Sequence, residues 1–177
     1  EFNGERIFVI GNGPSLNETP LESLGSEYSL AMNRISSIYA ERDWLPNFYY
    51  YALPPDHGGT PKDKKIITQN VDLGINCLLN SGWKEVLGKK ENVYYFDRWS
   101  LHNNNPFANA EIDQIEGLPM KYLYEFWSDS PQHVVYHYHS MYSAIQTVIS
   151  LGFDEIYFIG CDLGFSYMDP HMIFNSG

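Results

Sequence analysis

Six short runs of β-branched and aromatic residues recur along the chain, and their spacing constrains the fold more than any other feature. The runs are Arg6 to Ile10, Tyr28 to Met32, Phe48 to Ala52, Asn76 to Leu79, Val93 to Phe96 and Glu155 to Gly160. Most of them are about 15 to 25 residues apart, which leaves room for the crossover helix that parallel strands require. The sequence therefore predicts an α/β fold with a Rossmann-like, open, mostly parallel sheet of about six strands and helices on both faces.

Two segments carry helix signals. Apolar residues recur with helical spacing from Met141 to Leu151, with Ser140 as the predicted N-cap and Gly152 as the terminating residue. A second, short helix is predicted to begin within Thr19-Pro20-Leu21-Glu22, which has the residue pair of a capping box with Pro20 at the first helical position, and Gly25 ends it. Three segments rich in Gly, Pro, Asn or charge are predicted loops, namely Gly11 to Glu18, Pro54 to Lys65 and Asp97 to Pro119.

Length and charge limit the possible functions. The 177 residues suit a single domain, residues 1–177, and the formal net charge of -11 disfavours nucleic acid and anionic lipid as partners. No apolar run is long enough to span a membrane. Cys77 and Cys161 lie far apart in apolar segments, which favours two reduced thiols and a cytoplasmic location. Because the chain opens at Glu1 rather than Met and stops abruptly at Gly177, we expect it to lack an N-terminal piece and part of its C-terminal tail.

A glycine turn, Gly11-Asn12-Gly13-Pro14-Ser15, directly follows the first predicted strand. Ligands of open parallel sheets bind beyond the carboxyl ends of the strands, and glycines there let backbone N–H groups approach a phosphate. The turn is neither a dinucleotide fingerprint, because Leu16 replaces the third glycine, nor a Walker A loop, because no Gly-Lys-Ser/Thr follows. Two interpretations stay open for the glycines: a phosphate-binding loop, or a tight turn that only ends the strand.

Further polar residues follow the predicted strands or open the predicted helix. Asn33 closes the second strand with an amide that suits a ribose or nucleobase edge, although it could instead cap the segment that follows. Asp162 follows the last strand and would hold a sugar or ribose hydroxyl if that strand lies beside the first, or cap the local glycine turn. Ser140 and the first amides of its helix form a second candidate anion site, with an ordinary helix cap as the alternative.

Candidate catalytic and metal-binding residues are few. His171, near Tyr167 and Asp169, has the chemistry of a general base at neutral pH. His137 and His139 have an x-His-x-His spacing, but no Cys or carboxylate accompanies them at ligand spacing, and the chain has no Asp-x-Asp sequence. We therefore expect no metal site.

Several of these motifs occur together in one known superfamily. They are the Gly-Asn-Gly-Pro-Ser turn after the first strand, Met32-Asn33, His139-Ser140 before a helix, Leu151-Gly152-Phe153-Asp154-Glu155-Ile156-Tyr157 and Gly160-Cys161-Asp162. In these segments the chain resembles the superfamily of the bacterial CMP-sialic-acid-dependent sialyltransferases, the central domain of the motility-associated flagellin glycosylation factors and the archaeal 6-hydroxymethyl-dihydropterin diphosphokinases. The resemblance covers residues 6–34 and 139–165. Met141 and Ala52-Leu53 depart from the sialyltransferase pattern.

The resemblance implies a nucleotide held over the sheet edge by Gly11, Asn12, Gly13, Ser15, Asn33 and Ser140. It favours a metal-independent glycosyltransferase that takes a nucleotide-activated, CMP-linked sugar as co-substrate, needs no further cofactor and transfers the glycosyl group to a hydroxyl of a glycan or protein. His171 is the base that this function would use. Two alternatives remain: an ATP-dependent diphosphotransferase like the pterin diphosphokinases, and a non-catalytic nucleotide-binding module of a larger protein.

Overall fold

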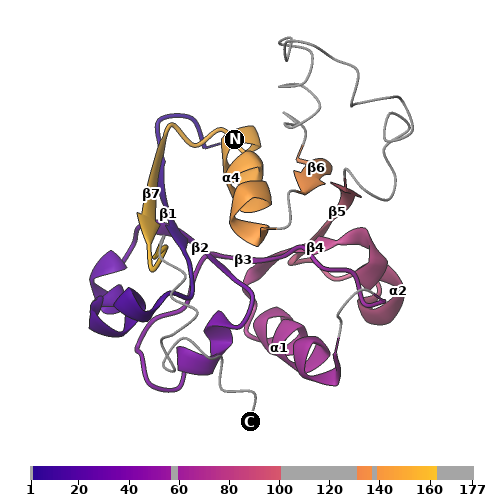
Figure 1. Ribbon diagram of the computed structural model, residues 1–177, viewed down its shortest axis with the longest axis horizontal. Helices are drawn as coiled ribbons and strands as arrows, with labels where there is room; N and C mark the ends of the chain where they lie inside the picture. The colour runs from indigo at the N-terminus through magenta and orange to yellow at the C-terminus, as the bar shows by residue number, and fades with distance from the viewer. Residues whose placement is uncertain (1, 57–59, 101–130, 137–138, 163–177) are drawn as a thin grey trace, which may run out of the picture.

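The computed structural model describes residues 2–56, 60–100, 131–136 and 139–162 (Figure 1). In this part of the chain one parallel sheet has seven strands in the order β6-β5-β4-β3-β2-β1-β7. The strands are β1 (Arg6–Ile10), β2 (Tyr28–Met32), β3 (Phe48–Tyr51), β4 (Asn76–Asn80), β5 (Val93–Ser100), β6 (His133–Tyr136) and β7 (Glu155–Ile159). The predicted α/β class is confirmed. Strand order reverses at β1, because β2 lies on one side of it and β7 on the other.

The sheet differs from the prediction at β5 and β6. The sequence pattern did not predict β6, and it placed Asp97 at the start of a loop. In the structure Asp97 to Ser100 continue β5 and pair with His133 to Tyr136. Pairing with β6 supplies hydrogen-bond partners for this polar stretch, so tertiary contact overrides its loop-like composition.

Helices cover both faces of the sheet, as predicted (Figure 1). Helix α1 (Pro61–Asp72) lies on one face and α4 (Ser140–Ser150) on the other, and α2 (Lys84–Leu87) is a single turn between β4 and β5. The connections from β1 to β3 carry 3₁₀ helices, at Pro14–Glu18, Leu21–Leu24 and Ile35–Ile38. A fourth 3₁₀ helix, Ser81–Trp83, precedes α2.

Two of the predicted loops contain helices. The segment Gly11 to Glu18 includes the 3₁₀ helix Pro14–Glu18, and α1 begins at Pro61 within the predicted loop Pro54 to Lys65. Thr60 and Asp63 form a capping box there, which the Pro and charge content of the segment had obscured. The capping box predicted at Thr19 and Glu22 is wrong, because the Thr19 hydroxyl donates instead to the Ser15 carbonyl (3.0 Å).

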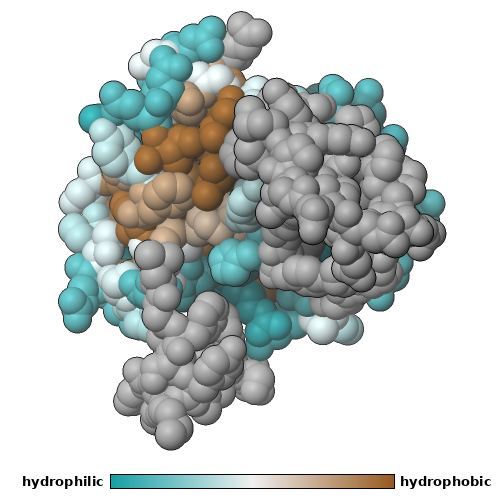
Figure 2. All heavy atoms as spheres, turned by 45° about the horizontal axis from the view of Figure 1, so that its top comes forward, coloured by the Kyte–Doolittle hydropathy of each residue, from teal (hydrophilic) through white to brown (hydrophobic). Residues whose placement is uncertain are grey.

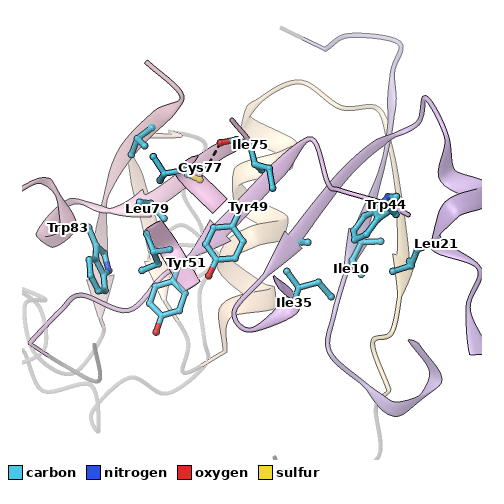
Figure 3. Close-up of a cluster of buried hydrophobic side chains, with 14 of the residues drawn as sticks. Ile10, Leu21, Ile35, Trp44, Tyr49, Tyr51, Ile75, Cys77, Leu79 and Trp83 are labelled. Atoms are coloured by element: carbon cyan, nitrogen blue, oxygen red, sulfur yellow. Dashed lines mark hydrogen bonds between the residues drawn. The ribbon is translucent and has the colours of Figure 1, made fainter. Parts of the chain in front are cut away.

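A cluster of buried side chains lies on the face of the sheet that α1 covers, and Figure 3 shows Tyr49, Cys77 and Leu79 among its members. Strand alternation places Tyr49 of β3 and Cys77 and Leu79 of β4 on this face, where each is fully buried together with Ile67 of α1. The Trp83 indole N–H donates to the Leu53 carbonyl (2.7 Å), so this large ring is buried with its polar atom satisfied.

The opposite face is packed by α4. Ala144 and Val148, one helical turn apart, are fully buried against Ile7 and Val9 of β1 and Leu30 of β2. Gly152, at a φ of 93°, ends the helix as predicted.

Part of the α4 face is apolar and exposed. Figure 2 shows apolar side chains gathered on it, and the exposed members include Ile149 of α4 (42%) and Phe158 of β7 (49%). In the described ranges no helix combines the length and the apolar character needed to cross a membrane. Both cysteines are free, as predicted.

Leu30→Ala is expected to lower the free energy of unfolding by about 2 to 5 kcal/mol, because it leaves a cavity between the sheet and α4, where Leu30 is fully buried. The control is Leu73→Ala, whose side chain is 46% exposed and whose loss should change stability by less than about 0.5 kcal/mol. Urea titrations followed by circular dichroism measure both values. Similar losses in the two variants would contradict the packing described for the α4 face.

Candidate functional site

The glycine turn (Gly11–Ser15) is hydrogen-bonded to the end of β7. Three of its N–H groups are donors: Gly11 to the Ile159 carbonyl (2.8 Å), Gly13 to the Gly160 carbonyl (2.8 Å) and Ser15 to the Asp162 carboxylate (2.9 Å). The interpretation of the turn as a phosphate-binding loop required these N–H groups to be free, and they are not. The parallel pairing of β1 with β7 carries the end of β7 alongside the turn, where its carbonyls take the N–H groups.

The close approach of β7 explains why glycine stands at two positions of the turn. A Cβ on Gly11 would lie 2.3 Å from the Gly160 carbonyl oxygen, and a Cβ on Gly13 would lie 2.2 Å from an Asp162 carboxylate oxygen. Gly160 itself has a φ of 62°, which favours glycine. Of the two interpretations of the glycines, the structure therefore supports the tight turn that ends the strand, because packing against the end of β7 is enough to require both residues.

Asp162 lies beside the turn, because β7 and β1 are neighbours. The Ser15 side chain and the Ser15 N–H stabilise its charged form and hold the pKa of the carboxyl below its usual value. Burial raises the pKa of the adjacent Cys161 thiol, so this group stays uncharged at neutral pH. The β7 side of the site is therefore negatively charged.

Asn12 and Asn33 bring two amide side chains to the ends of β1 and β2. The Asn12 side-chain amide donates to the Met32 carbonyl (3.1 Å), and its backbone N–H makes no hydrogen bond to any described residue. Asn33 adopts a φ of 56°, held by its N–H to the Tyr50 carbonyl (3.3 Å) and by the Tyr49 hydroxyl, which donates to the Asn33 carbonyl (2.6 Å). Non-glycine residues in this strained region are concentrated at functional sites.

The side chain of Asn33 is left available for a ligand. It is partly exposed and makes no hydrogen bond to another residue of the described part. The alternative role, capping the segment Arg34 to Ala40, is not what the structure shows, since Arg34 is the N-cap of the helix there and no side chain caps it.

Arg34 and Asp63 lie next to this site and were not singled out in the sequence. Arg34 Nε lies 3.8 Å from an Asp63 carboxylate oxygen, and the Asp63 side chain is only 5% exposed. The other Asp63 oxygen accepts from the Thr60 N–H (3.0 Å) and hydroxyl (2.6 Å). Burial and the Asp63 charge both raise the pKa of nearby Tyr51, so the phenol stays protonated. The Thr60-Pro61-x-Asp63 pattern was the signal that could have located α1 and this carboxylate.

The amino end of α4 also lies at the carboxyl edge of the sheet, because the helix runs against the strands (Figure 1). Ser140 is the first residue of the helix rather than its predicted N-cap. The cap is His139, whose Nδ1 accepts from the Met141 N–H (3.2 Å). The Ser140 hydroxyl is not used as a cap, so it stays available for a ligand, and the positive end of the helix dipole faces this edge.

Other sequence-based candidates lie outside the described residues. They include His171, the proposed base, with Tyr167 and Asp169, and also His137. Within the described residues, no three His, Cys, Asp or Glu side chains are grouped so that they could hold a metal ion.

No protein-family model and no curated protein matches this sequence. The solved structure of the MAf glycosyltransferase from Magnetospirillum magneticum AMB-1 is similar, with a TM-score of 0.55 and 17% sequence identity. The similarity covers 99% of this chain and 25% of that protein, so this chain spans about a quarter of its length. At this identity the similarity shows a shared fold.

Gly11→Ala is expected to destabilise the protein by about 3 kcal/mol, because its Cβ would displace a backbone carbonyl of the β7 end rather than a flexible side chain. Gly74→Ala is the control: Gly74 follows α1 with a φ of 77° and has open space around it, so the cost should be about 1 kcal/mol. Urea unfolding of both variants measures the difference. An equal cost would show that contact with β7 does not restrict the turn.

The lowered pKa of the Asp162 carboxyl predicts that the stability of the protein depends on pH. A carboxylate whose pKa is depressed by folding contributes stability that is present above its unfolded pKa of about 3.9 and is lost as pH falls through the lower folded value. The wild type should therefore exceed Asp162→Asn in urea midpoint by a constant margin near neutral pH, and the margin should shrink below about pH 4. A margin independent of pH from 7 to 2.5 would contradict the role of the Ser15 contacts.

Proposed function

We propose that this chain is the nucleotide-binding part of a metal-independent glycosyltransferase whose donor is a CMP-linked sugar. The observation that carries the proposal is that the glycine turn, which includes Asn12, lies beside Asn33 where strand order reverses at β1. In open parallel sheets, ligands bind in the crevice at such a reversal. The fold shared with a glycosyltransferase supports the same class of reaction.

The site offers side chains suited to a nucleoside and a phosphate. The Asn33 amide both donates and accepts, so it can pair with a ribose or nucleobase edge. The free Asn12 N–H and the amino end of α4 with Ser140 are donors for a phosphate oxygen. Asp162 can accept a hydrogen bond from a sugar hydroxyl, while Gly11, Gly13 and Ser15 contribute shape rather than free N–H groups.

The chemical step needs stabilisation of the departing phosphate and a base for the acceptor hydroxyl. Donors fixed before the reaction stabilise the charge that develops on the phosphate as the glycosyl bond breaks. His171 is the residue that we propose as the base, and the acceptor is a hydroxyl of a glycan or protein.

Isothermal titration with CMP, ATP and GDP, each with and without EDTA, tests the proposal. We expect CMP to bind most tightly and with an affinity that EDTA does not change. Asn33→Gly, which keeps the positive φ of this position unstrained, and Ser140→Ala should each weaken CMP binding by about 1 to 3 kcal/mol, the cost of losing a hydrogen bond in a ligand site. Asn17→Ala is the control, because Asn17 lies just past the turn on an exposed surface.

The same titrations separate the alternatives. Binding of ATP that depends on Mg²⁺ would overturn the CMP proposal in favour of diphosphate transfer. CMP binding that survives both Asn33→Gly and Ser140→Ala in folded protein would remove these two side chains from the site. Binding of CMP without hydrolysis or transfer of a CMP-sugar would favour a non-catalytic nucleotide-binding module.

A further inference from the structure

A nucleotide phosphate at this edge needs a positive group that the glycine turn does not supply. Three of the turn's N–H groups donate hydrogen bonds to the end of β7 and the residues after it, and one of the acceptors is the carboxylate of Asp162. A second negative charge brought close to Asp162 would be repelled. The phosphate is therefore better held on the β2 side of the turn, away from β7.

Arg34 is the cation on that side. Among the described segments that follow β1, β2, β3 and β7 (residues 11–15, 33–34, 52–56 and 160–162), Arg34 is the one basic residue, while Asp56 and Asp162 are acidic. It follows Asn33 directly, and Asn12 of the glycine turn is hydrogen-bonded to the residue before Asn33 (3.1 Å). The backbone of Arg34 therefore lies at the same edge of the sheet as both amide side chains, and its guanidinium lies beside Asp63 of α1.

Asp63 positions the guanidinium of Arg34 without taking up its hydrogen-bond donors. Its Nε lies 3.8 Å from Asp63, beyond hydrogen-bond distance, and the Arg34 side chain is 39% exposed. Asp63 already accepts two hydrogen bonds from Thr60 through its other oxygen. The buried carboxylate thus holds the guanidinium near the sheet edge by charge, and leaves its N–H groups for another anion.

We propose that Arg34 binds the phosphate of the nucleotide, with the planar guanidinium donating two hydrogen bonds to phosphate oxygens. This inference rests on the proposed nucleotide-binding function and adds the residue that supplies the charge. Arginine suits this role because its fork of N–H donors matches two oxygens of a phosphate, a geometry that lysine lacks.

Titrations of CMP and cytidine, which differ only by the phosphate, test the role of Arg34. Arg34→Gln should weaken CMP binding about 10-fold or more, the usual loss for a hydrogen bond to a charged group, and change cytidine binding by less than about 2-fold. Arg34→Lys should give an intermediate loss for CMP. The control is Arg42→Gln, whose side chain is bonded to the Asn17 carbonyl (2.9 Å) and lies near Glu22 (3.7 Å). It should bind both ligands as the wild type does.

The outcomes separate this inference from the function on which it rests. Wild-type protein that binds neither CMP nor cytidine contradicts the proposed function itself. Wild-type binding of CMP that Arg34→Gln leaves intact overturns the role of Arg34 alone. Equal losses for CMP and cytidine in both Arg34 variants would also overturn it, because they would show that Arg34 only supports the fold near Asp63.

Discussion

The pairing of β7 with β1 is the interaction on which the rest of the site depends. It brings the last described strand, more than a hundred residues away in sequence, against the turn that follows the first strand. The end of β7 then takes the N–H groups of Gly11, Gly13 and Ser15, and the contact is too close for any side chain on the two glycines. The shape of the turn is therefore set by contacts within the protein.

This arrangement changes which groups are available to a ligand. A glycine-rich turn after a first strand usually suggests a cradle of backbone N–H groups. Here that capacity is largely used by the protein, and the groups left over are the side chains of Asn12, Asn33 and Arg34, the N–H of Asn12, and the start of α4. Because side-chain donors are directional and chemically distinct, such a site would discriminate between ligands through these few residues.

Much of the fold could be predicted because its signals are local. Runs of β-branched and aromatic residues predicted six of the seven strands that the described ranges contain, and helical spacing predicted α4 to within one residue at each end. Failures arose where tertiary contact decides: β6 and the second half of β5 exist because they pair with each other. The sequence predicted Ser140 as the cap of α4, whereas the structure has His139 in that role. Both residues have a side chain able to accept from the first turn, so the pattern did not distinguish them.

The candidate site also has features that the sequence predicted and features that only tertiary contacts decided. The sequence by itself determined that a glycine turn, an amide after β2 and an acid after β7 follow strands of a parallel sheet, and hence that they lie at one edge. Only the tertiary structure decided what each group does there. Strand order made β7 the partner of the turn, and the placement of α1 put the buried Asp63 beside Arg34. The physical reason is that hydrogen-bond donors and charges are assigned by distances between segments remote in the chain, and periodicity carries no information about those distances.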